Sequence, residues 1–246
     1  MSELTGKRAL VTGASRGIGA AIAIALADKG ADVVITYERS AERAADIVQS
    51  IEEKGRRGFA IQADSADPAA VKRSVDEAAA KLGGLDILVN NAGIARTGSF
   101  METQLGDIDA MLNVNVRAAL LASQAAIPYI KQGGRIITIG SNVAERVPFG
   151  GLTVYALTKS ALLSFTRGLA RELGAQQITV NLVQPGPIDT DLNPADGDLA
   201  HVNLPFTALG HYGRPADIGH AVAFLASPAA SYMTGSVMTV DGGFNA

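Results

Sequence analysis

A glycine-rich turn close to the start of the chain constrains the fold more than any other feature. Residues 12–19 read TGASRGIG, follow an apolar run at residues 9–11 and precede an alanine-rich stretch at residues 20–29. This order of strand, glycine turn and helix is the setting of a dinucleotide-binding site, because the glycines permit a tight turn and a close approach to a pyrophosphate. The free amides and the dipole at the helix start favour phosphate charge. The glycine spacing alone also suits an ordinary turn, so the prediction depends on this setting and on a second motif.

Short β-rich runs alternate with longer helical patterns along the rest of the chain. Such alternation is typical of a parallel sheet with helices on both faces. No proline-rich or serine-rich linker divides the pattern, so the sequence predicts one doubly wound α/β domain over residues 1–246. We expect strands near residues 8–12, 32–36, 58–62, 86–90, 134–139, 179–183 and 236–240.

One stretch breaks this alternation. Residues 185–214 are rich in proline, aspartate and glycine and have no regular pattern. A stretch of this length is either a surface loop or a lid over a site. Because it directly follows the end of a predicted strand, we expect a substrate lid at residues 187–213.

Composition excludes several classes of protein. The chain has 246 residues, a formal net charge of −3 and no cysteine. It therefore has no disulfide and no thiolate nucleophile, which is compatible with a cytoplasmic location. No apolar run approaches the roughly 20 residues of a membrane span, and no basic field for nucleic acid or an anionic membrane is expected. The three histidines, His201, His211 and His220, lack metal-ligand spacing, so we expect no metal site.

Small or polar residues follow the predicted strands. The carboxyl ends of parallel strands meet at one edge of the sheet, where ligands bind. Any one of these residues fits an ordinary turn, but together they predict a ligand site at that edge. Beyond the glycine turn they are Tyr37, Glu38, Arg39, Ser40, Asp64, Ser65, Asn91, Ala92, Gly93, Ser141, Pro185 and Gly186.

The end of the second strand distinguishes between the two nicotinamide dinucleotides. An NAD site usually places a carboxylate there for the ribose hydroxyls, whereas an NADP site needs cationic space for the 2′-phosphate. Tyr37 stands where that carboxylate is expected, while Asp32 opens the strand and so lies at its other end. Arg16 and Arg39 can donate to a phosphate. Glu38 opposes this reading, and NADP(H) is the cofactor that the residues favour.

The second motif is a tyrosine and a lysine four residues apart, Tyr155 and Lys159, in a predicted helix over residues 153–173. One helical turn places both on one face. A nearby ammonium favours the phenolate, so the lysine could make the tyrosine a usable acid or base. The pair alone equally fits a half-buried aromatic ring beside a snorkelling lysine. Ser141 at the end of the preceding strand favours the chemical reading, and without a histidine base a hydrolase triad is disfavoured.

Taken in order, these motifs resemble those of the short-chain dehydrogenase/reductases over essentially the whole chain. No single motif is specific, but the full ordered series is. The matching segments are Thr12-Gly13-x-x-x-Gly17-Ile18-Gly19, Asn90-Asn91-Ala92-Gly93, Asn115, Ser141, Tyr155-x-x-x-Lys159, Pro185-Gly186-Pro187-Ile188-x-Thr190 and Val240-Asp241-Gly242-Gly243. The resemblance implies a seven-stranded Rossmann sheet, commonly assembled as a homotetramer.

The resemblance also implies roles for individual residues. Tyr155 would protonate the developing alkoxide of a ketone, Ser141 would bind the carbonyl oxygen, and Lys159 would bind the nicotinamide ribose while lowering the pKa of the tyrosine. Asn115 would hold a water that joins Lys159 to solvent; its alternative is a polar residue that kinks a helix.

The same resemblance gives a set of expected cofactor contacts. Within it, Asp64 would meet the adenine, Asn91 the ribose, and Ile188 with Thr190 the nicotinamide end. The full set is Gly13, Ser15, Arg16, Gly17, Ile18, Gly19, Tyr37, Arg39, Ser40, Asp64, Ser65, Asn91, Ala92, Gly93, Tyr155, Lys159, Pro185, Gly186, Ile188 and Thr190.

Three functions remain open on the sequence. The first is an NADPH-dependent carbonyl reductase acting on a small ketone or alcohol. The second is a 3-oxoacyl-carrier-protein reductase, which much of the chain resembles, although Gln132 and Gln176 stand where that group carries arginines. The third is a nucleotide-binding regulator, since residues 184–191 resemble a branch that includes a cyclic-di-GMP-binding biofilm dispersal mediator.

Overall fold

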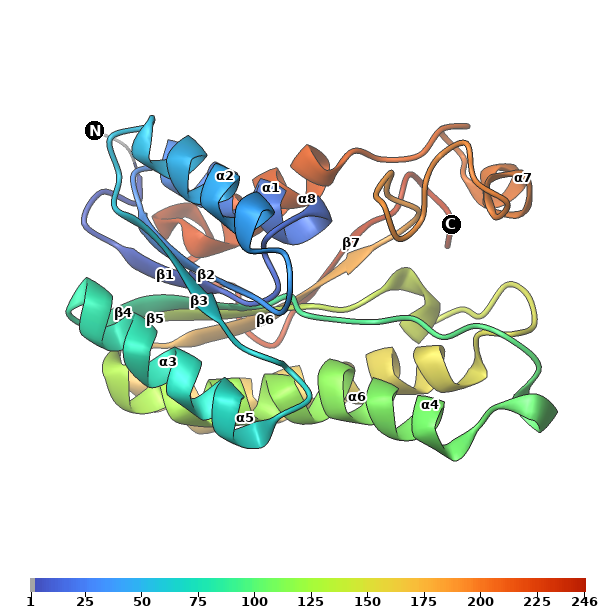
Figure 1. Ribbon diagram of the computed structural model, residues 1–246, viewed down its shortest axis with the longest axis horizontal. Helices are drawn as coiled ribbons and strands as arrows, with labels where there is room; N and C mark the ends of the chain where they lie inside the picture. The colour runs from blue at the N-terminus through green and yellow to red at the C-terminus, as the bar shows by residue number, and fades with distance from the viewer. Residues whose placement is uncertain (1–2) are drawn as a thin grey trace.

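The chain forms a single sheet of seven parallel strands in the computed structural model, which describes residues 3–246. The strand order is β3-β2-β1-β4-β5-β6-β7 (Figure 1). The predicted fold class, a doubly wound parallel sheet with helices on both faces, is confirmed. The strands are β1 Arg8–Val11, β2 Asp32–Tyr37, β3 Gly58–Gln62, β4 Leu85–Asn90, β5 Ile130–Ile139, β6 Thr179–Pro185 and β7 Val237–Val240.

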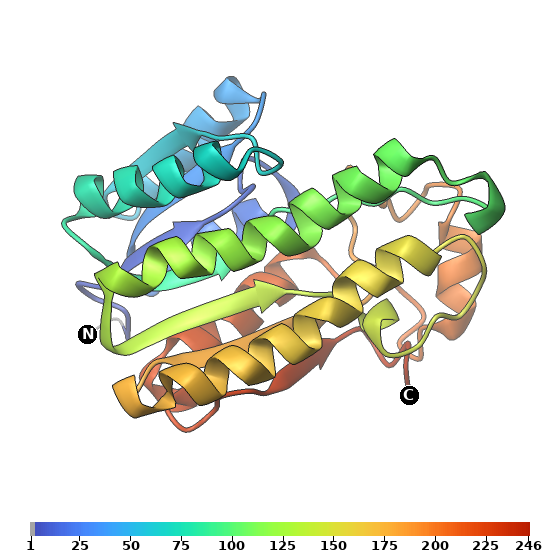
Figure 2. The ribbon, with the colours of Figure 1, turned by 90° about the horizontal axis from the view of Figure 1, so that it is seen from below.

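Helices cover the sheet in two layers (Figure 1). One layer contains α1 (Gly17–Asp28), α2 (Ala41–Glu52) and α8 (Pro215–Ala226). The other contains α3 (Pro68–Leu82), α5 (Ala118–Ala126) and α6 (Thr153–Leu173), with α4 (Leu105–Met111) leading into α5. Figure 2 shows that α4 and α5 belong to one continuous rod beside α6.

Consecutive residues of the central strands belong to opposite cores. In β2, Val33 and Ile35 pack under the α1 layer, whereas Val34 packs under the α3 layer. Side chains alternate across a strand, and a parallel sheet with both faces covered needs apolar residues on both sides. Each fully buried aliphatic side chain contributes about 1.5–3 kcal/mol, which explains why these strands are continuous apolar runs.

The order of strands also decides where a ligand can bind. β1 lies between β2 and β4, so the chain runs outward in one direction from β1 to β3 and in the other from β4 to β7. At such a reversal the crossover helices leave to opposite faces and open a crevice beyond the carboxyl ends of the strands. The glycine turn after β1 and the turn after β4 therefore lie next to each other in the lining of that crevice.

Two elements differ from the sequence prediction. β5 begins at Ile130, four residues before the predicted start, because Ile130 pairs with Leu85 ahead of a bulge at which Gly133 has a φ of +82°. The rod between α4 and α5 contains a π-helix, Leu112–Arg117, where the sequence predicted only a helix.

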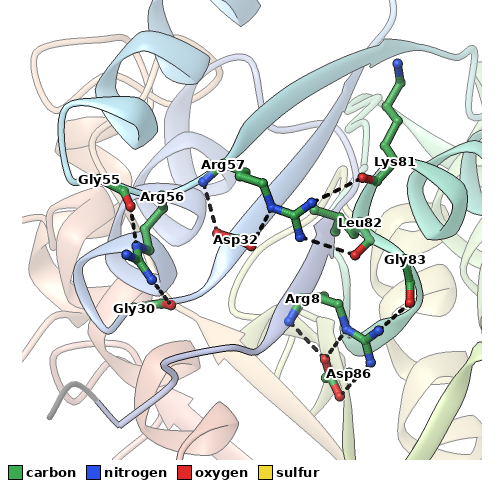
Figure 3. Close-up of polar contacts among 10 residues, drawn as sticks. All are labelled: Arg8, Gly30, Asp32, Gly55, Arg56, Arg57, Lys81, Leu82, Gly83 and Asp86. Carbon is green, nitrogen blue, oxygen red and sulfur yellow. Dashed lines mark hydrogen bonds and ion pairs between the residues drawn. The ribbon is translucent and has the colours of Figure 1, made fainter.

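Arginine side chains make ion pairs and hydrogen bonds at the amino-terminal edge of the sheet, opposite the crevice (Figure 3). Arg8 donates to the carboxylate of Asp86, with Nε 2.7 Å from Oδ2. Arg57 donates to Asp32 at 2.8 Å and to the carbonyl of Leu82 at the end of α3. Asp32 lies at the amino end of β2, as predicted, where Arg57 engages it, and it is not available to a ligand in the crevice.

The remaining stretch, residues 187–213, contains only short elements. They are α7 (Ala200–Asn203) and a 3₁₀ turn, Leu204–Phe206. An isolated bridge between Ile188 and Gly213 joins the two ends of the segment, and a second one, between Thr190 and Asn193, lies near its start. Across residues 3–246 no helix has the length and apolar character needed to cross a membrane.

Candidate active site

A cleft of about 1250 Å³ lies at the carboxyl ends of the strands. This volume exceeds the roughly 300–1,000 Å³ of a typical ligand pocket, so the cleft has room for a dinucleotide and a second molecule. Every residue that the sequence singled out for catalysis or for a cofactor contact lines this cleft, except Asn115. Asn115 is buried, with 2 % of its surface exposed.

Backbone geometry explains the three glycines of the turn. Gly13 and Gly17 have φ values of +62° and +56°, a region that favours glycine. A Cβ on Gly13 would lie 2.9 Å from the Cα of Ala92, and one on Gly19 would lie 2.7 Å from the carbonyl oxygen of Gly13. The turn after β1 and the turn after β4 therefore approach each other as closely as backbone allows.

Side chains from three strands brace this turn. Thr36 Oγ1 accepts a hydrogen bond from the Gly13 amide at 3.0 Å. Thr12 Oγ1 accepts one from the Asn91 amide at 3.0 Å, and Asn91 Nδ2 donates to the carbonyls of Thr12 and Gly13. The Asn91 amide group, which the sequence assigned to a ribose, thus supports the glycine turn. The bracing roles of Thr12 and Thr36 were not predicted, because they depend on pairing between strands.

The start of α1 is suited to an anion. Arg16 is the N-cap residue, makes no side-chain capping bond, and no acidic residue lies in the first turn. The amides of the first helical turn have no acceptor within the helix, and the helix dipole adds partial positive charge there. With Gly17 allowing close approach, this end of the cleft fits the pyrophosphate of a dinucleotide.

Ser141, Tyr155 and Lys159 meet on the opposite side of the cleft. Ser141 follows β5, and its hydroxyl lies close enough to the phenol of Tyr155, in the first turn of α6, to influence the pKa of that phenol. The ammonium of Lys159 donates to the carbonyl oxygen of Ile139 at 3.0 Å and lies 5.8 Å from the centre of the Tyr155 ring. The hydroxyl, the phenol and the ammonium thus converge although the serine and the tyrosine are 14 positions apart in the chain.

Burial controls the proton affinities of this cluster. It raises the pKa of Tyr155 above its ordinary value, an effect that the hydrogen bond with Ser141 opposes but does not cancel. Burial also lowers the pKa of Lys159 to about 8. In the protein without ligands the pKa of Tyr155 is thus raised, because desolvation of the phenolate outweighs the opposing influence of Ser141. The effect of Lys159 on that pKa, which the resemblance implies, stays a prediction.

Asn115 lies behind the cleft wall, in the π-helix. Its Oδ1 accepts from the amide of Ile94 at 2.8 Å, and its Nδ2 donates to the carbonyl of Ile94 and to Oγ1 of Thr158. Thr158 in turn donates to the carbonyl of Tyr155 at 2.7 Å. π-helical turns are frequent at functional sites, and here the turn aims one side chain at both the β4 loop and α6.

Gly93 lies between this asparagine and the lysine. A Cβ on Gly93 would be 3.4 Å from Nζ of Lys159 and 3.5 Å from Oδ1 of Asn115. The absence of a side chain at this position therefore keeps a polar space open beside the ammonium.

Charged residues gather where β2 and α2 reach the cleft. Glu38 and Arg39 pair with each other at 2.8 Å, and the Arg39 side chain is 87 % exposed. Arg16 instead contacts Asp191, which also accepts from Arg43 in the first turn of α2. Neither Arg43 nor Asp191 was predicted. The place of Arg43 just beyond Ser40, the N-cap of α2, could have indicated a role at the cleft. Its contact with Asp191 could not have been predicted, because the two residues are far apart in the chain.

Polar side chains such as Asn142, Asn193 and Asn203 line the cleft beside a group of apolar side chains. The apolar side chains come from the loop before α6, from residues 187–213 and from the carboxyl terminus, and the ring of Phe244 lies 5.5 Å from that of Phe206. In the part of the chain that the structure describes, no group of three or more His, Cys, Asp or Glu side chains could hold a metal ion. The apolar lining residues are Val143, Pro148, Phe149, Leu152, Leu192, Leu199, Val202 and Phe244.

Comparison with known proteins agrees with the fold and the motifs. The family model described as enoyl-(acyl carrier protein) reductase, adh_short_C2, matches residues 13–245. A short-chain dehydrogenase from Burkholderia cenocepacia J2315, crystallised in complex with NADP, is 57 % identical with a TM-score of 0.98, over 99 % of this chain and 100 % of that one.

Two curated relatives point to different activities. The cyclic-di-GMP-binding biofilm dispersal mediator protein of Escherichia coli is 43 % identical over all of both chains. A 3-oxoacyl-[acyl-carrier-protein] reductase of Staphylococcus aureus is 41 % identical over 96 % of this chain and 97 % of that protein. The resemblance seen in the sequence is confirmed: the chain belongs to the short-chain dehydrogenase/reductase family of oxidoreductases.

Proposed function

We propose that the chain is an NADPH-dependent carbonyl reductase that transfers a hydride between nicotinamide and a ketone or secondary alcohol. The observation that carries this proposal is the convergence of Ser141, Tyr155 and Lys159 on one wall of a cleft whose other wall is the glycine turn. A hydroxyl donor, a phenol and an ammonium beside a dinucleotide cradle suit the reduction of a carbonyl group.

Two observations support NADPH as the coenzyme. Arg16, Arg39 and Arg43 lie around the end of β2, where a 2′-phosphate needs cations, and Asp32 is engaged at the far end of that strand. A structural neighbour from a metagenomic library, 54 % identical, was crystallised with NADPH. We propose the same coenzyme for this chain.

The mechanism assigns one task to each residue. Bound NADPH would supply the hydride that the carbonyl carbon accepts. Ser141 would donate a hydrogen bond to the carbonyl oxygen, and Tyr155 would transfer its proton to the oxyanion as it forms. A donor aimed at a developing oxyanion contributes about 3 kcal/mol. The phenol holds the proton that this step needs at neutral pH, since the ordinary pKa of tyrosine is about 10 and burial raises that of Tyr155 further.

Lys159 and Asn115 would serve the proton supply. Lys159 is mostly protonated at pH 7, because its pKa is about 8. Its positive charge would stabilise the phenolate that is left after proton transfer. We further propose that a water held near Asn115, in the space beside Gly93, returns a proton to this pair. The hydrogen bonds from Asn115 to Ile94 and Thr158 also make it a positioning residue for α6.

The substrate class that we propose is an uncharged, apolar ketone. The segment before α6 and residues 187–213 give the cleft much of its apolar lining, together with uncharged polar side chains such as Asn193 and Asn203, and the charged lining residues gather mainly at the β2 end. Gln132 and Gln176, which replace carrier-binding arginines of the 3-oxoacyl reductases, lie before the bulge of β5 and before β6, at the sheet edge opposite Ser141. An acidic carrier protein therefore lacks these two anchors.

Other features of the proposal concern the assembly. We propose that residues 187–213 act as the substrate lid of a single domain, because Leu192, Leu199 and Val202 from this segment line the cleft. A homotetramer is supported by the apolar side chains that α4, the π-helix and α5 expose, such as Leu105, Leu112 and Leu120. The cytoplasmic location stays a prediction.

The decisive test compares wild type with Tyr155→Phe. We expect NADPH oxidation that depends on an apolar ketone in wild type, and a loss of at least a hundredfold in the variant, with NADPH binding retained in a fluorescence titration. Equal rates in the two proteins would refute the assignment. Saturable binding of cyclic-di-GMP by a wild-type protein without ketone-dependent NADPH loss would favour the regulator. Far higher activity on acyl-carrier substrates than on free ketones would favour the carrier-protein reductase.

A further inference from the structure

One carboxylate holds two arginines from separate elements at the edge of the cleft. Asp191 Oδ2 accepts from Nη1 of Arg43 at 2.6 Å and from Nη1 of Arg16 at 3.2 Å. Arg16 caps α1, Arg43 lies in the first turn of α2, and Asp191 follows β6. All three side chains are about half exposed, so the contacts can break without disturbing a core.

The segment that carries Asp191 crosses directly over the glycine turn. A Cβ on Gly17 would lie 3.5 Å from the Cγ2 of Thr190, the residue before Asp191. The two arginines flank the carboxyl end of β2, where a dinucleotide places the ribose of its adenosine half. A phosphate on that ribose would therefore approach Arg16, which lines the cleft, and Arg43, which shares the Asp191 carboxylate with it.

Carboxylate and phosphate compete for the same donors. Guanidinium groups bind both anions through paired N–H donors, and a phosphate monoester carries up to two negative charges where the carboxylate carries one. A coenzyme with a 2′-phosphate can therefore replace Asp191, whereas a coenzyme without one leaves the Arg16–Asp191–Arg43 contacts in place.

We propose that Asp191 is a resident competitor of the coenzyme's 2′-phosphate at the Arg16–Arg43 pair. Asp191 thus lowers the affinity for NADPH but not that for NADH. The preference for NADPH over NADH is therefore smaller than it would be if the two arginines had no carboxylate partner. Asp191 re-forms its contacts as the coenzyme leaves. This inference rests on the proposed use of NADPH. It adds Arg43, which shares the Asp191 carboxylate with Arg16, to the arginines that bind this phosphate.

The test measures binding without turnover. Wild type, Asp191→Asn, Arg43→Gln and Asp198→Asn are titrated with NADPH, NADH and adenosine 2′,5′-bisphosphate, a probe that has the 2′-phosphate but no nicotinamide. Asp198→Asn is the matched control, because it removes one charge from an exposed residue of the same segment that does not line the cleft.

We expect Asp191→Asn to tighten NADPH and the bisphosphate about threefold to tenfold, the range that two half-exposed ion pairs can supply. Affinity for NADH should change by less than about twofold, and the gain should shrink with added salt. Arg43→Gln should weaken only NADPH and the bisphosphate, the two ligands with a 2′-phosphate, and Asp198→Asn should leave all three affinities unchanged.

Three results would overturn the inference while leaving the proposed function intact. The first is an unchanged NADPH affinity in Asp191→Asn. The second is weaker binding of both NADPH and NADH by Asp191→Asn, which would indicate that Asp191 helps to close the segment over the coenzyme. The third is an equal gain in NADPH affinity in Asp198→Asn. Failure of wild type to bind either NADPH or the bisphosphate would overturn the proposed coenzyme and this inference together.

Discussion

Replacing Lys159 with methionine should stabilise the protein while it destroys turnover. The ammonium is buried, and its nearest polar partner is the neutral carbonyl of Ile139, 3.0 Å away. Methionine has a similar length and a flexible, apolar side chain that fits irregular space. The substitution therefore removes a desolvated charge and leaves the packing largely intact.

The size of the effect follows from the proton affinity of the lysine. Burial lowers the pKa of Lys159 from the ordinary value of 10.5 to about 8. At about 1.4 kcal/mol for each factor of ten, holding the ammonium in this site costs the folded protein about 3 kcal/mol at pH 7. Losing the hydrogen bond to Ile139 costs about 1 kcal/mol, so we expect Lys159→Met to gain about 2 kcal/mol.

The dependence on pH distinguishes this cause from better packing. Below pH 8 the lysine is charged in both the folded and the unfolded chain, so the folded protein bears the full penalty. Between pH 8 and about 10.5 the folded chain releases the proton first, and wild-type stability rises because the unfolded chain binds more protons. The advantage of the variant should therefore shrink between pH 7 and pH 9.5.

Urea unfolding of the coenzyme-free proteins at these two pH values measures both predictions. Lys131→Met, at an exposed position in the bulge of β5, is the matched control and should show neither effect. Equal or lower stability of Lys159→Met at pH 7, or a gain that persists unchanged at pH 9.5, would refute the reasoning. Ketone reduction by the same variant tests the expected loss of turnover.

Two further predictions depend on pH. Because burial lowers the pKa of Lys159 to about 8, kcat/KM for reduction should fall as the pH rises through 8; a profile that stays level past pH 9 would show that the ammonium is not needed. Burial raises the pKa of Asp32, but hydrogen bonds from Arg57 outweigh it and leave that pKa lowered. Asp32→Asn should therefore lose about 1 kcal/mol at pH 7. Because the pKa of Asp32 is lowered in the folded chain, this loss should shrink in urea unfolding as the pH falls below the ordinary value of 3.8 and Asp32 takes up its proton; a loss that stays constant there would contradict the pairing.

The fold could be predicted because its signals are local. Strands of a parallel sheet with two covered faces are apolar runs, and glycine positions are dictated by backbone angles, so both can be recognised in the sequence. Helix α6, Thr153–Leu173, has the predicted ends. The early start of β5 was missed because it depends on one pair, Ile130 with Leu85, on a neighbouring strand.

The cleft lining was predictable for a related reason. In a parallel sheet, each residue that directly follows a strand lies at the same edge, so position along the chain specifies position in space. Arg43 and Asp191 escaped this rule, because they lie 148 residues apart and meet only through the path of the segment after β6.

The sequence by itself thus determined the sheet, the glycine cradle and the set of residues that gathers around the cleft, since each depends on the chemistry of neighbouring residues. Only the tertiary structure decided how strongly Tyr155 and Lys159 hold their protons and which anion Arg16 and Arg43 bind. These properties depend on burial and on charges brought from distant parts of the chain, because the free energy of a charge depends on its surroundings in space and not on its neighbours in sequence.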